Sequence, residues 1–311
     1  MRNHERYRFA FDDYKITKEI AAAEPRGGEG VLLIMLKNVK FGFVGSGQMG
    51  QAIFRGMVYS KEVCPENICV TDIDETRLET IRKDLGVNTL LSDKQNLGAV
   101  ALASAVDVLV LAVSPQLAKN VLQSIAGALL PKTLVVSIMG GITLDFIEAI
   151  VPQSPVIRVM PNTPLMVRKG VSGIAMGQKT NKEHEQFILD MFGLLGAAYI
   201  LPENLIDPFT GVCGCSPAFA YLFMDAIAMG GVERGLPAAQ AIRMVAQSIA
   251  GAAEMIIQTG KHPGELIANV CTPAGSTIAG IHSLEEKAFK GIVMSALCES
   301  CDRMLSVGEK A

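Results

Sequence analysis

The sequence lacks the features that mark several large classes of protein. Its 311 residues carry a net charge of -3 without long runs of one sign, so nothing favours binding to nucleic acid or to an anionic membrane. Its longest charge-free stretches, Pro208–Met224 and Leu266–Leu284, contain proline, glycine and polar side chains, so neither predicts a membrane-spanning helix. A small molecule is therefore the expected partner.

Cysteine and histidine do not form the patterns of a disulfide framework or a metal site. Seven cysteines, an odd number scattered along the chain, suggest reduced thiols in a cytoplasmic protein. The pair Cys298 and Cys301 has no second pair and no nearby histidine, so we expect an inert helix pair and not a zinc or redox site. The four histidines are dispersed, and no metal site is predicted.

Length and composition predict two domains behind a short extension. Half of the residues are hydrophobic, which is enough to bury two cores. Residues 1–34 are polar and mixed in charge, without the pattern of a secretory signal or a transit peptide, so we expect a disordered extension. Met35 is an alternative natural start. We expect a dinucleotide-binding domain over 35–203 and a helical domain over 204–311.

Short β-branched runs alternate with helical stretches from Lys40 to about Glu203, which predicts an α/β fold with a doubly wound parallel sheet and crossover helices. The run at 108–113 is apolar throughout, as expected for a strand covered on both faces. The predicted strands are Lys40–Val44, Asn67–Thr71, Val108–Val113, Leu134–Ser137, Val156–Val159 and Ala197–Leu201.

The last third of the chain predicts helices only. The expected helices are Pro217–Gly230, Pro237–Thr259 and Leu284–Leu305. They carry many small residues and few charges, so we expect part of their surface to be buried against a second subunit. A monomeric bundle with a tight core is the alternative.

A glycine-rich turn, Gly45-Ser-Gly-Gln-Met-Gly50, directly follows the first predicted strand and opens a helix. That context favours dinucleotide binding over a chance match. Gly45 permits a tight turn, Gly47 lets a pyrophosphate approach the backbone, and Gly50 lets the helix pack on the strand.

Two further segments belong to the same predicted edge of the sheet. Asp72 lies near the spacing at which an acidic residue accepts hydrogen bonds from the ribose of NADH, and a carboxylate there repels a 2′-phosphate. The competing arrangement has Thr71 and Arg77 around the phosphate, with Asp72 pointing away. Pro115, within Ala112–Gln116, predicts a rigid turn into a helix where cofactors bind.

The segment Val270–Gly280 combines turn formers, small residues and three hydroxyls between two helical patterns. Pro273 and Gly275 allow a tight turn, and Ser276 and Thr277 are suitable N-cap residues for the next helix. Such a loop presents backbone N–H groups at a helix N-terminus and can bind a small carboxylate. An ordinary capped connection is the alternative.

Taken in order, these segments resemble pyrroline-5-carboxylate reductase from about Met35 to the C-terminus. The matching motifs are Gly45–Gly50, Ala112–Gln116 with Ser114 in place of lysine, Arg158–Pro164, Gly214–Ala218, Gly231–Pro237, His262–Gly264 and Thr272–Thr277. The last is similar to the family's Ser-Pro-Gly-Gly-Thr-Thr, with Ala274 at its first glycine. Ile73 stands where many NADPH-preferring members carry a basic residue, which again favours NADH.

The resemblance implies a Rossmann domain, a helical domain that dimerises, and dimers that often assemble into a decamer. It implies a cytoplasmic oxidoreductase of proline biosynthesis that reduces 1-pyrroline-5-carboxylate to L-proline with NADH or NADPH. The expected cofactor-binding residues are Gly45, Gly47, Gln48, Met49, Gly50, Asp72, Ala112, Val113, Ser114, Pro115 and Asn162. The expected substrate-binding residues are Val270, Thr272, Ala274, Gly275, Ser276 and Thr277, with Thr277 as the catalytic residue.

The chemistry of a cyclic imine agrees with this set. An imine is already electrophilic, so hydride transfer mainly needs correct placement of the two reactants, and a hydroxyl such as that of Thr277 can hold the ring nitrogen. No lysine or histidine in the helical part is evidently poised to transfer a proton, which favours imine reduction over reduction of a ketone.

Three alternatives stay open. The chain could reduce another small cyclic imine, or it could be a related β-hydroxyacid dehydrogenase, although the catalytic-lysine motif of that group is not visible. It could also be a dinucleotide-binding regulator that has lost turnover. Such a regulator should tolerate decay of the substrate loop, whereas the hydroxyls of Thr272, Ser276 and Thr277 are present.

Overall fold

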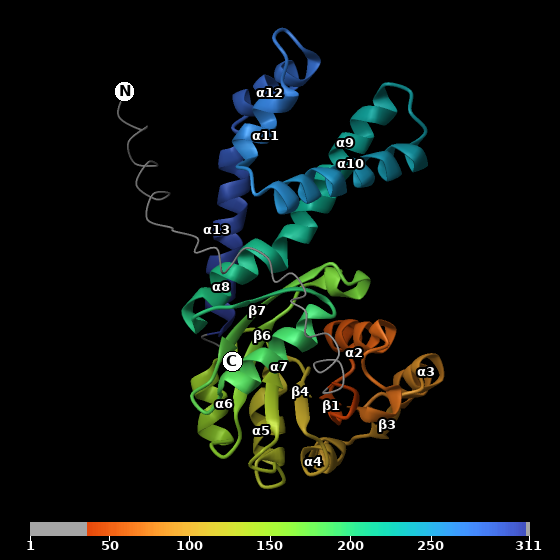
Figure 1. Ribbon diagram of the computed structural model, residues 1–311, viewed down its shortest axis with the longest axis vertical. Coiled ribbons are helices and arrows are strands. Elements are labelled where there is room, and N and C mark those ends of the chain that lie inside the picture. Colours follow the sequence, from red (N-terminus) through yellow and green to blue (C-terminus); the bar gives the residue numbers. More distant parts are fainter. Residues whose placement is uncertain (1–35, 309–311) are drawn as a thin grey trace.

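The computed structural model describes residues 36–308 and divides them into a sheet half and a helical half (Figure 1). The expected extension at 1–34, and the alternative start at Met35, lie outside these residues. We call the part from β1 to β8 the sheet half and the part from α8 to α13 the helical half.

The sheet half contains eight strands in the order β3-β2-β1-β4-β5-β6-β7-β8. The pairs of neighbours are parallel except β6 with β7, which is antiparallel. The strands are β1 (Phe41–Val44), β2 (Ile68–Asp72), β3 (Asn88–Leu91), β4 (Val108–Leu111), β5 (Leu134–Ser137), β6 (Val156–Met160), β7 (Gly170–Met176) and β8 (Gly196–Ile200).

Helices cover both faces of this sheet. They are α2 (Gln48–Ser60), α3 (Glu75–Leu85), α4 (Leu97–Ala103), α5 (Ala118–Ile125), α6 (Leu144–Ile150) and α7 (Lys182–Gly193). One buried cluster joins α2, α3 and α7 to the sheet, and a second joins α4, α5 and α6 to its other face. The predicted doubly wound α/β fold is therefore confirmed.

The six predicted strands all exist, with ends that differ by at most two residues. Two strands were not predicted. β3 lies at the sheet edge and has no fully buried residue, and β7 is interrupted by glycine, so neither carries a clear apolar pattern.

The helical half follows β8 without further strands. A short turn at Glu203–Leu205 leads into α8 (Ile206–Phe209), a π-helical segment at Thr210–Cys215, α9 (Ser216–Glu233), α10 (Ala238–Thr259), α11 (Pro263–Val270), α12 (Ser276–Glu286) and α13 (Phe289–Gly308). The predicted helix at Leu284–Leu305 was wrong at its start, because Ala288 adopts a positive φ of 55° and separates α12 from α13.

The helical half has almost no core of its own. It forms two arms, the hairpin of α9 and α10 and the group of α11, α12 and α13 (Figure 1). Among its described residues the buried hydrophobic side chains are Ile206, Ala228 and Ala241, while Leu222 and Ile257 are 72% and 75% exposed. Apolar helices of this kind need a further surface to cover them.

One stretch of the helical half, Glu203–Glu233, is long and apolar enough to cross a membrane by length and composition, with a mean hydropathy of 1.5. A single helix of this kind is weak evidence for a membrane span. The stretch also contains Asp207 and Asp225, and a charged side chain is costly inside a bilayer.

Candidate functional site

The glycine loop after β1 has two glycines that close contacts require and one that faces open space. Gly45 has a φ of +96°, and a Cβ there would lie 2.7 Å from the carbonyl oxygen of Ala112. A Cβ on Gly50 would lie 2.9 Å from the carbonyl oxygen of Gly45. Gly47 is the N-cap of α2 and has no atom within 4 Å of a Cβ position. The loop therefore leaves open space at a helix N-terminus, which fits a pyrophosphate.

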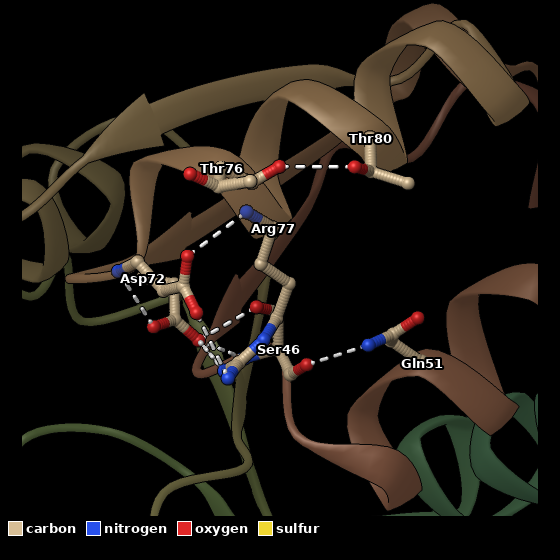
Figure 2. A network of polar contacts seen from close by, with 7 residues as sticks. Ser46, Gln51, Asp72, Thr76, Arg77 and Thr80 are labelled. Carbon is tan, nitrogen blue, oxygen red and sulfur yellow. Dashed lines mark hydrogen bonds and ion pairs between the residues drawn. The ribbon is translucent and has the colours of Figure 1, made fainter.

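Asp72, the last residue of β2, points towards the glycine loop (Figure 2). Its Oδ2 accepts hydrogen bonds from the backbone N–H and the hydroxyl of Ser46, at 2.7 and 2.6 Å. Arg77 lies 3.4 Å from the same oxygen and also pairs with Asp74 at 3.0 Å. Asp72 therefore does not turn away from the cofactor edge.

The neighbours of the Asp72 carboxyl favour its ionised form. Partial burial raises its pKa, but the hydrogen bonds from Ser46 and Asp74 and the charge of Arg77 outweigh burial and hold the pKa below its ordinary value. Sequence reasoning missed Ser46. Its side chain is completely buried, and a small polar residue between two glycines was the only available signal.

The segment after β4 lies directly against the glycine loop. The N–H of Ala112 donates to the carbonyl of Val44 at 2.8 Å, and its Cβ would touch one built on Gly50. Ser114 is exposed, and Pro115 begins a short 3-10 helix, Pro115–Leu117, as the sequence predicted.

Asn162 follows β6 and is bound by the protein itself. Its Nδ2 donates to the carbonyl of Cys213 at 2.9 Å, and its Oδ1 accepts the N–H of Val171 at 2.8 Å. The side chain therefore ties the sheet half to the π-helical segment. Its contact with a cofactor stays a prediction.

The expected substrate loop forms a tight turn between α11 and α12. The N–H of Gly275 donates to the carbonyl of Thr272 at 3.0 Å, and Ala274 inside the turn has a φ of 57°. A Cβ on Gly275 would collide with the Thr272 hydroxyl. The prediction that Ser276 or Thr277 caps the helix was wrong. Gly275 is the N-cap and Ser276 is the first helical residue, so their hydroxyls are free of that role.

The structure brings predicted cofactor-binding residues together at one edge of the sheet. It does not bring the predicted substrate-binding residues close to them. The glycine loop, Asp72 and the segment from Ala112 to Pro115 meet at the carboxyl edge of the sheet. The turn at Thr272–Thr277 lies at the far end of the helical half (Figure 1), where Val270 is 64% exposed. One chain therefore does not close a site from both sets.

The described residues contain no group of three or more histidine, cysteine, aspartate or glutamate side chains placed to hold a metal ion. All seven cysteines are unpaired. Burial raises the pKa of Cys69 and of Cys213, so neither thiol is activated by its surroundings.

Comparison with known proteins finds relatives along most of the chain. A family model described as pyrroline-5-carboxylate reductase dimerisation matches residues 203–306, and one described as coenzyme F420-dependent NADP oxidoreductase matches residues 40–141. The chain is 37% identical to pyrroline-5-carboxylate reductase of Methanosarcina acetivorans over 276 residues, 88% of this chain and 100% of the relative. It is 35% identical to the Escherichia coli enzyme over 265 residues, 85% of this chain and 96% of the relative.

Solved structures give the same result. The pyrroline carboxylate reductase of Plasmodium falciparum with NADP bound is 30% identical, with a TM-score of 0.78, and the match covers 88% of this chain and 99% of that chain. The pyrroline-5-carboxylate reductase of Coxiella burnetii is 27% identical, with a TM-score of 0.76, and the match covers 86% and 97%.

Proposed function

The chain belongs to the pyrroline-5-carboxylate reductase family, and we propose that its glycine loop and its Thr272–Thr277 turn are the two halves of the active site. The protein reduces 1-pyrroline-5-carboxylate to L-proline with NAD(P)H, a step of proline biosynthesis. The observation that carries the proposed site is the open backbone at Gly47, held beside the Asp72 carboxylate.

The cofactor half binds through the backbone and one carboxylate. The bound cofactor supplies the hydride. The N–H groups of the first turn of α2 bind its pyrophosphate next to Gly47. Asp72 orients the ribose, since its Oδ1 accepts a hydrogen bond from the N–H of Asp74 at 3.1 Å and retains a second lone pair.

The substrate half holds the carboxylate and the ring nitrogen. The first backbone N–H groups of α12, at Ser276 and Thr277, have no acceptor within the helix and face a negative charge favourably. The Thr277 hydroxyl, which caps no helix, holds the ring nitrogen and relays a proton to it. No strong acid is needed, because a cyclic imine is electrophilic before it is protonated.

The two halves come from different subunits in this proposal. The family model for dimerisation covers the helical half, whose apolar arms are exposed in a single chain. The chain therefore forms a homodimer, and the dimer places the turn of one subunit against the cofactor half of its partner. Burial against the partner subunit in this dimer also accounts for the apolar stretch Glu203–Glu233 without a membrane.

NADH is the preferred cofactor in this proposal. Asp72 points towards the ribose site, and Thr71, which the competing arrangement placed against a 2′-phosphate, is only 1% exposed. Arg77 is shared between the carboxylates of Asp72 and Asp74, so the local charge is negative. The relative from Plasmodium falciparum was solved with NADP, which makes this preference a direct point of difference to test.

We assign residues 35–203 to the cofactor domain and 204–311 to the substrate-binding and dimerisation domain. We also propose a cytoplasmic location and assembly of dimers into a higher oligomer, with a decamer as the form that the family resemblance favours.

One assay tests the proposed function. Purified protein is mixed with 1-pyrroline-5-carboxylate and either NADH or NADPH, and cofactor oxidation is followed by absorbance. Proline formation with a higher rate for NADH is expected. No oxidation of either cofactor would favour the non-catalytic regulator, and turnover only with another cyclic imine would favour the alternative reductase.

A further inference from the structure

A buried arginine lies where the chain passes from the sheet half to the helical half. Arg158, in β6, is only 3% exposed. Its Nη1 lies 3.0 Å from Oε1 of Glu203, and its Nη2 lies 3.4 Å from Oδ1 of Asp207. One guanidinium thus binds two carboxylates of Glu203–Cys215, the stretch between β8 and α9 that we call the joining segment.

Two further contacts hold the joining segment to the sheet half. Oε1 of Glu203 also accepts the N–H of Leu144, the first residue of α6, at 2.7 Å. Beyond Asp207, the ring of Phe209 packs over Gly173 in β7, where a Cβ would lie 2.7 Å from the ring. Arg158 is the only charged side chain among the buried residues of the described chain, which makes it the electrostatic centre of this junction.

Stability alone does not account for such an arrangement. An ion pair with a buried charge gains little net free energy over apolar packing, because the buried charge loses its hydration, and its best-attested use is to fix one geometry among several. The guanidinium is suited to that use, since its planar fork holds two acceptors at fixed directions, which a lysine does not do. The Nε atom of Arg158 has no hydrogen-bond partner among the described atoms. The two hydrogen bonds that orient the side chain, from Nη1 and Nη2, therefore both go to the joining segment.

We infer that Arg158, through Glu203 and Asp207, is a positioning residue that sets the angle between the two halves and thereby the distance over which hydride is transferred. The inference rests on the proposed function, in which the cofactor lies on the sheet half and the substrate on a helical half. Because the helical halves of a dimer are joined to each other, the angle at each junction fixes where the partner's turn meets the cofactor. A misplacement of about 1 Å between reacting groups costs up to about a hundredfold in rate.

The test compares three variants of the full-length protein with a buried control. Arg158→Met removes the fork and is expected to fold, because the carboxylates of Glu203 and Asp207 are 28% and 36% exposed and can be hydrated. Arg158→Lys retains the charge and reaches one partner, and Asp207→Asn weakens one arm of the fork. Ile125→Ala is the control, since Ile125 is completely buried at the end of α5 away from the cofactor edge.

We expect Arg158→Met to lower kcat at least about tenfold while the dissociation constant for the reduced cofactor stays unchanged. The deuterium isotope effect on kcat, measured with cofactor labelled at the transferred position, should rise, because hydride transfer becomes the slow step. Arg158→Lys should recover part of the rate. Asp207→Asn should lower kcat less than Arg158→Met, and adding it to Arg158→Met should cost little more.

Ile125→Ala should lower the melting temperature without changing kcat or the isotope effect at a temperature where it is folded. If Arg158→Met and Arg158→Lys behave like this control, Arg158 has a structural role only and the inference is overturned. If the unmodified protein shows no turnover, the proposed function itself fails, which is a different result from an active protein with an inert Arg158 variant.

Discussion

Ser46 donates two hydrogen bonds to a single oxygen of Asp72, one from its backbone N–H at 2.7 Å and one from its hydroxyl at 2.6 Å. The bonds join the glycine loop to the end of β2, and they hold the carboxylate towards the place where the ribose of the cofactor is proposed to lie. Contacts within the protein therefore set the orientation of Asp72.

Substitution of Asp72 tests the cofactor preference. Asp72→Asn removes the charge that opposes a 2′-phosphate and releases Arg77 to meet it. The ratio of kcat/KM for NADPH over that for NADH should rise at least tenfold, or about 1.4 kcal/mol. Asp84→Asn, which removes a carboxylate paired with Arg55 at 3.2 Å on the same half, should leave the ratio unchanged. An unaltered ratio in Asp72→Asn would end the argument for NADH.

The hydroxyl of Thr277 should matter for substrate and not for cofactor. Thr277→Ala should lower kcat/KM for 1-pyrroline-5-carboxylate at least tenfold, about 1.4 kcal/mol, and Thr277→Ser should retain most of it. Cofactor affinity, measured by fluorescence titration, should not change. Thr80→Ala is a matched control, because the Thr80 hydroxyl donates to the carbonyl of Thr76 within α3 (Figure 2). Unchanged kinetics in Thr277→Ala would remove this residue from the site.

Ala274 adopts a backbone conformation that glycine occupies more readily, with a φ of 57°. Ala274→Gly should raise the melting temperature by about 1–2 °C, because relief of left-handed strain of about 1 kcal/mol is partly offset by the greater freedom of glycine when unfolded. Ala288→Gly removes the same strain at a φ of 55° outside the turn. Only Ala274→Gly should also change KM for the substrate. Equal KM values in both variants would show that the turn does not contact substrate.

The exposed arm formed by α9 should be an interface. Leu222→Glu places a charge on a side chain that is 72% exposed in one chain, and it should weaken dimerisation by at least about 2 kcal/mol, roughly thirtyfold in the dissociation constant. Sedimentation should show monomers, and turnover should fall with the dimer fraction if the site is shared. Leu130→Glu, at a 38% exposed position of the sheet half, should do neither. Active monomers would contradict the shared site.

Stability should fall in mild acid because of His184. Its Nδ1 accepts the N–H of Asn181 at 3.2 Å at the start of α7, a role that only the neutral ring can have. Burial lowers the pKa of His184, against a smaller opposite effect of Glu183. The unfolded chain therefore binds the proton first, and stability present above the unfolded pKa is lost as pH falls through about 6.5 towards the lower folded value. His184→Gln should flatten the fall in melting temperature between pH 7.5 and 5.5, and an identical slope would contradict this.

Sequence alone predicted the elements that a short local pattern specifies, such as an apolar run or a glycine motif. The run at 108–113 contains β4, Val108–Leu111, whose four residues are all buried, and Gly45 and Gly50 have the close contacts expected of them, while the reason expected for Gly47 stays a prediction. The edge strand β3 was missed because exposed strands need no apolar alternation.

Sequence reasoning favoured an Asp72 that faces the cofactor edge, but it did not predict the partners of Asp72 or the junction at Arg158. Asp72 meets Ser46 across 26 positions of the chain, and Arg158 meets its two carboxylates across 45 and 49. No local pattern contains both members of such a pair. The placement of the substrate turn at the far end of the helical half likewise depends on packing that a single linear pattern does not hold.

The contacts of Asn162 with Cys213 and Val171 have a consequence for protein engineering. A chimaera that exchanges helical halves between relatives would most simply be fused after β8. Such a fusion separates Asn162 from the Cys213 carbonyl and Arg158 from its two carboxylates, although each half would be complete by its own secondary structure. A crossover placed after residue 215, with the joining segment kept together with β6 and β7, preserves these bonds and should give active hybrids where the earlier crossover gives misaligned ones.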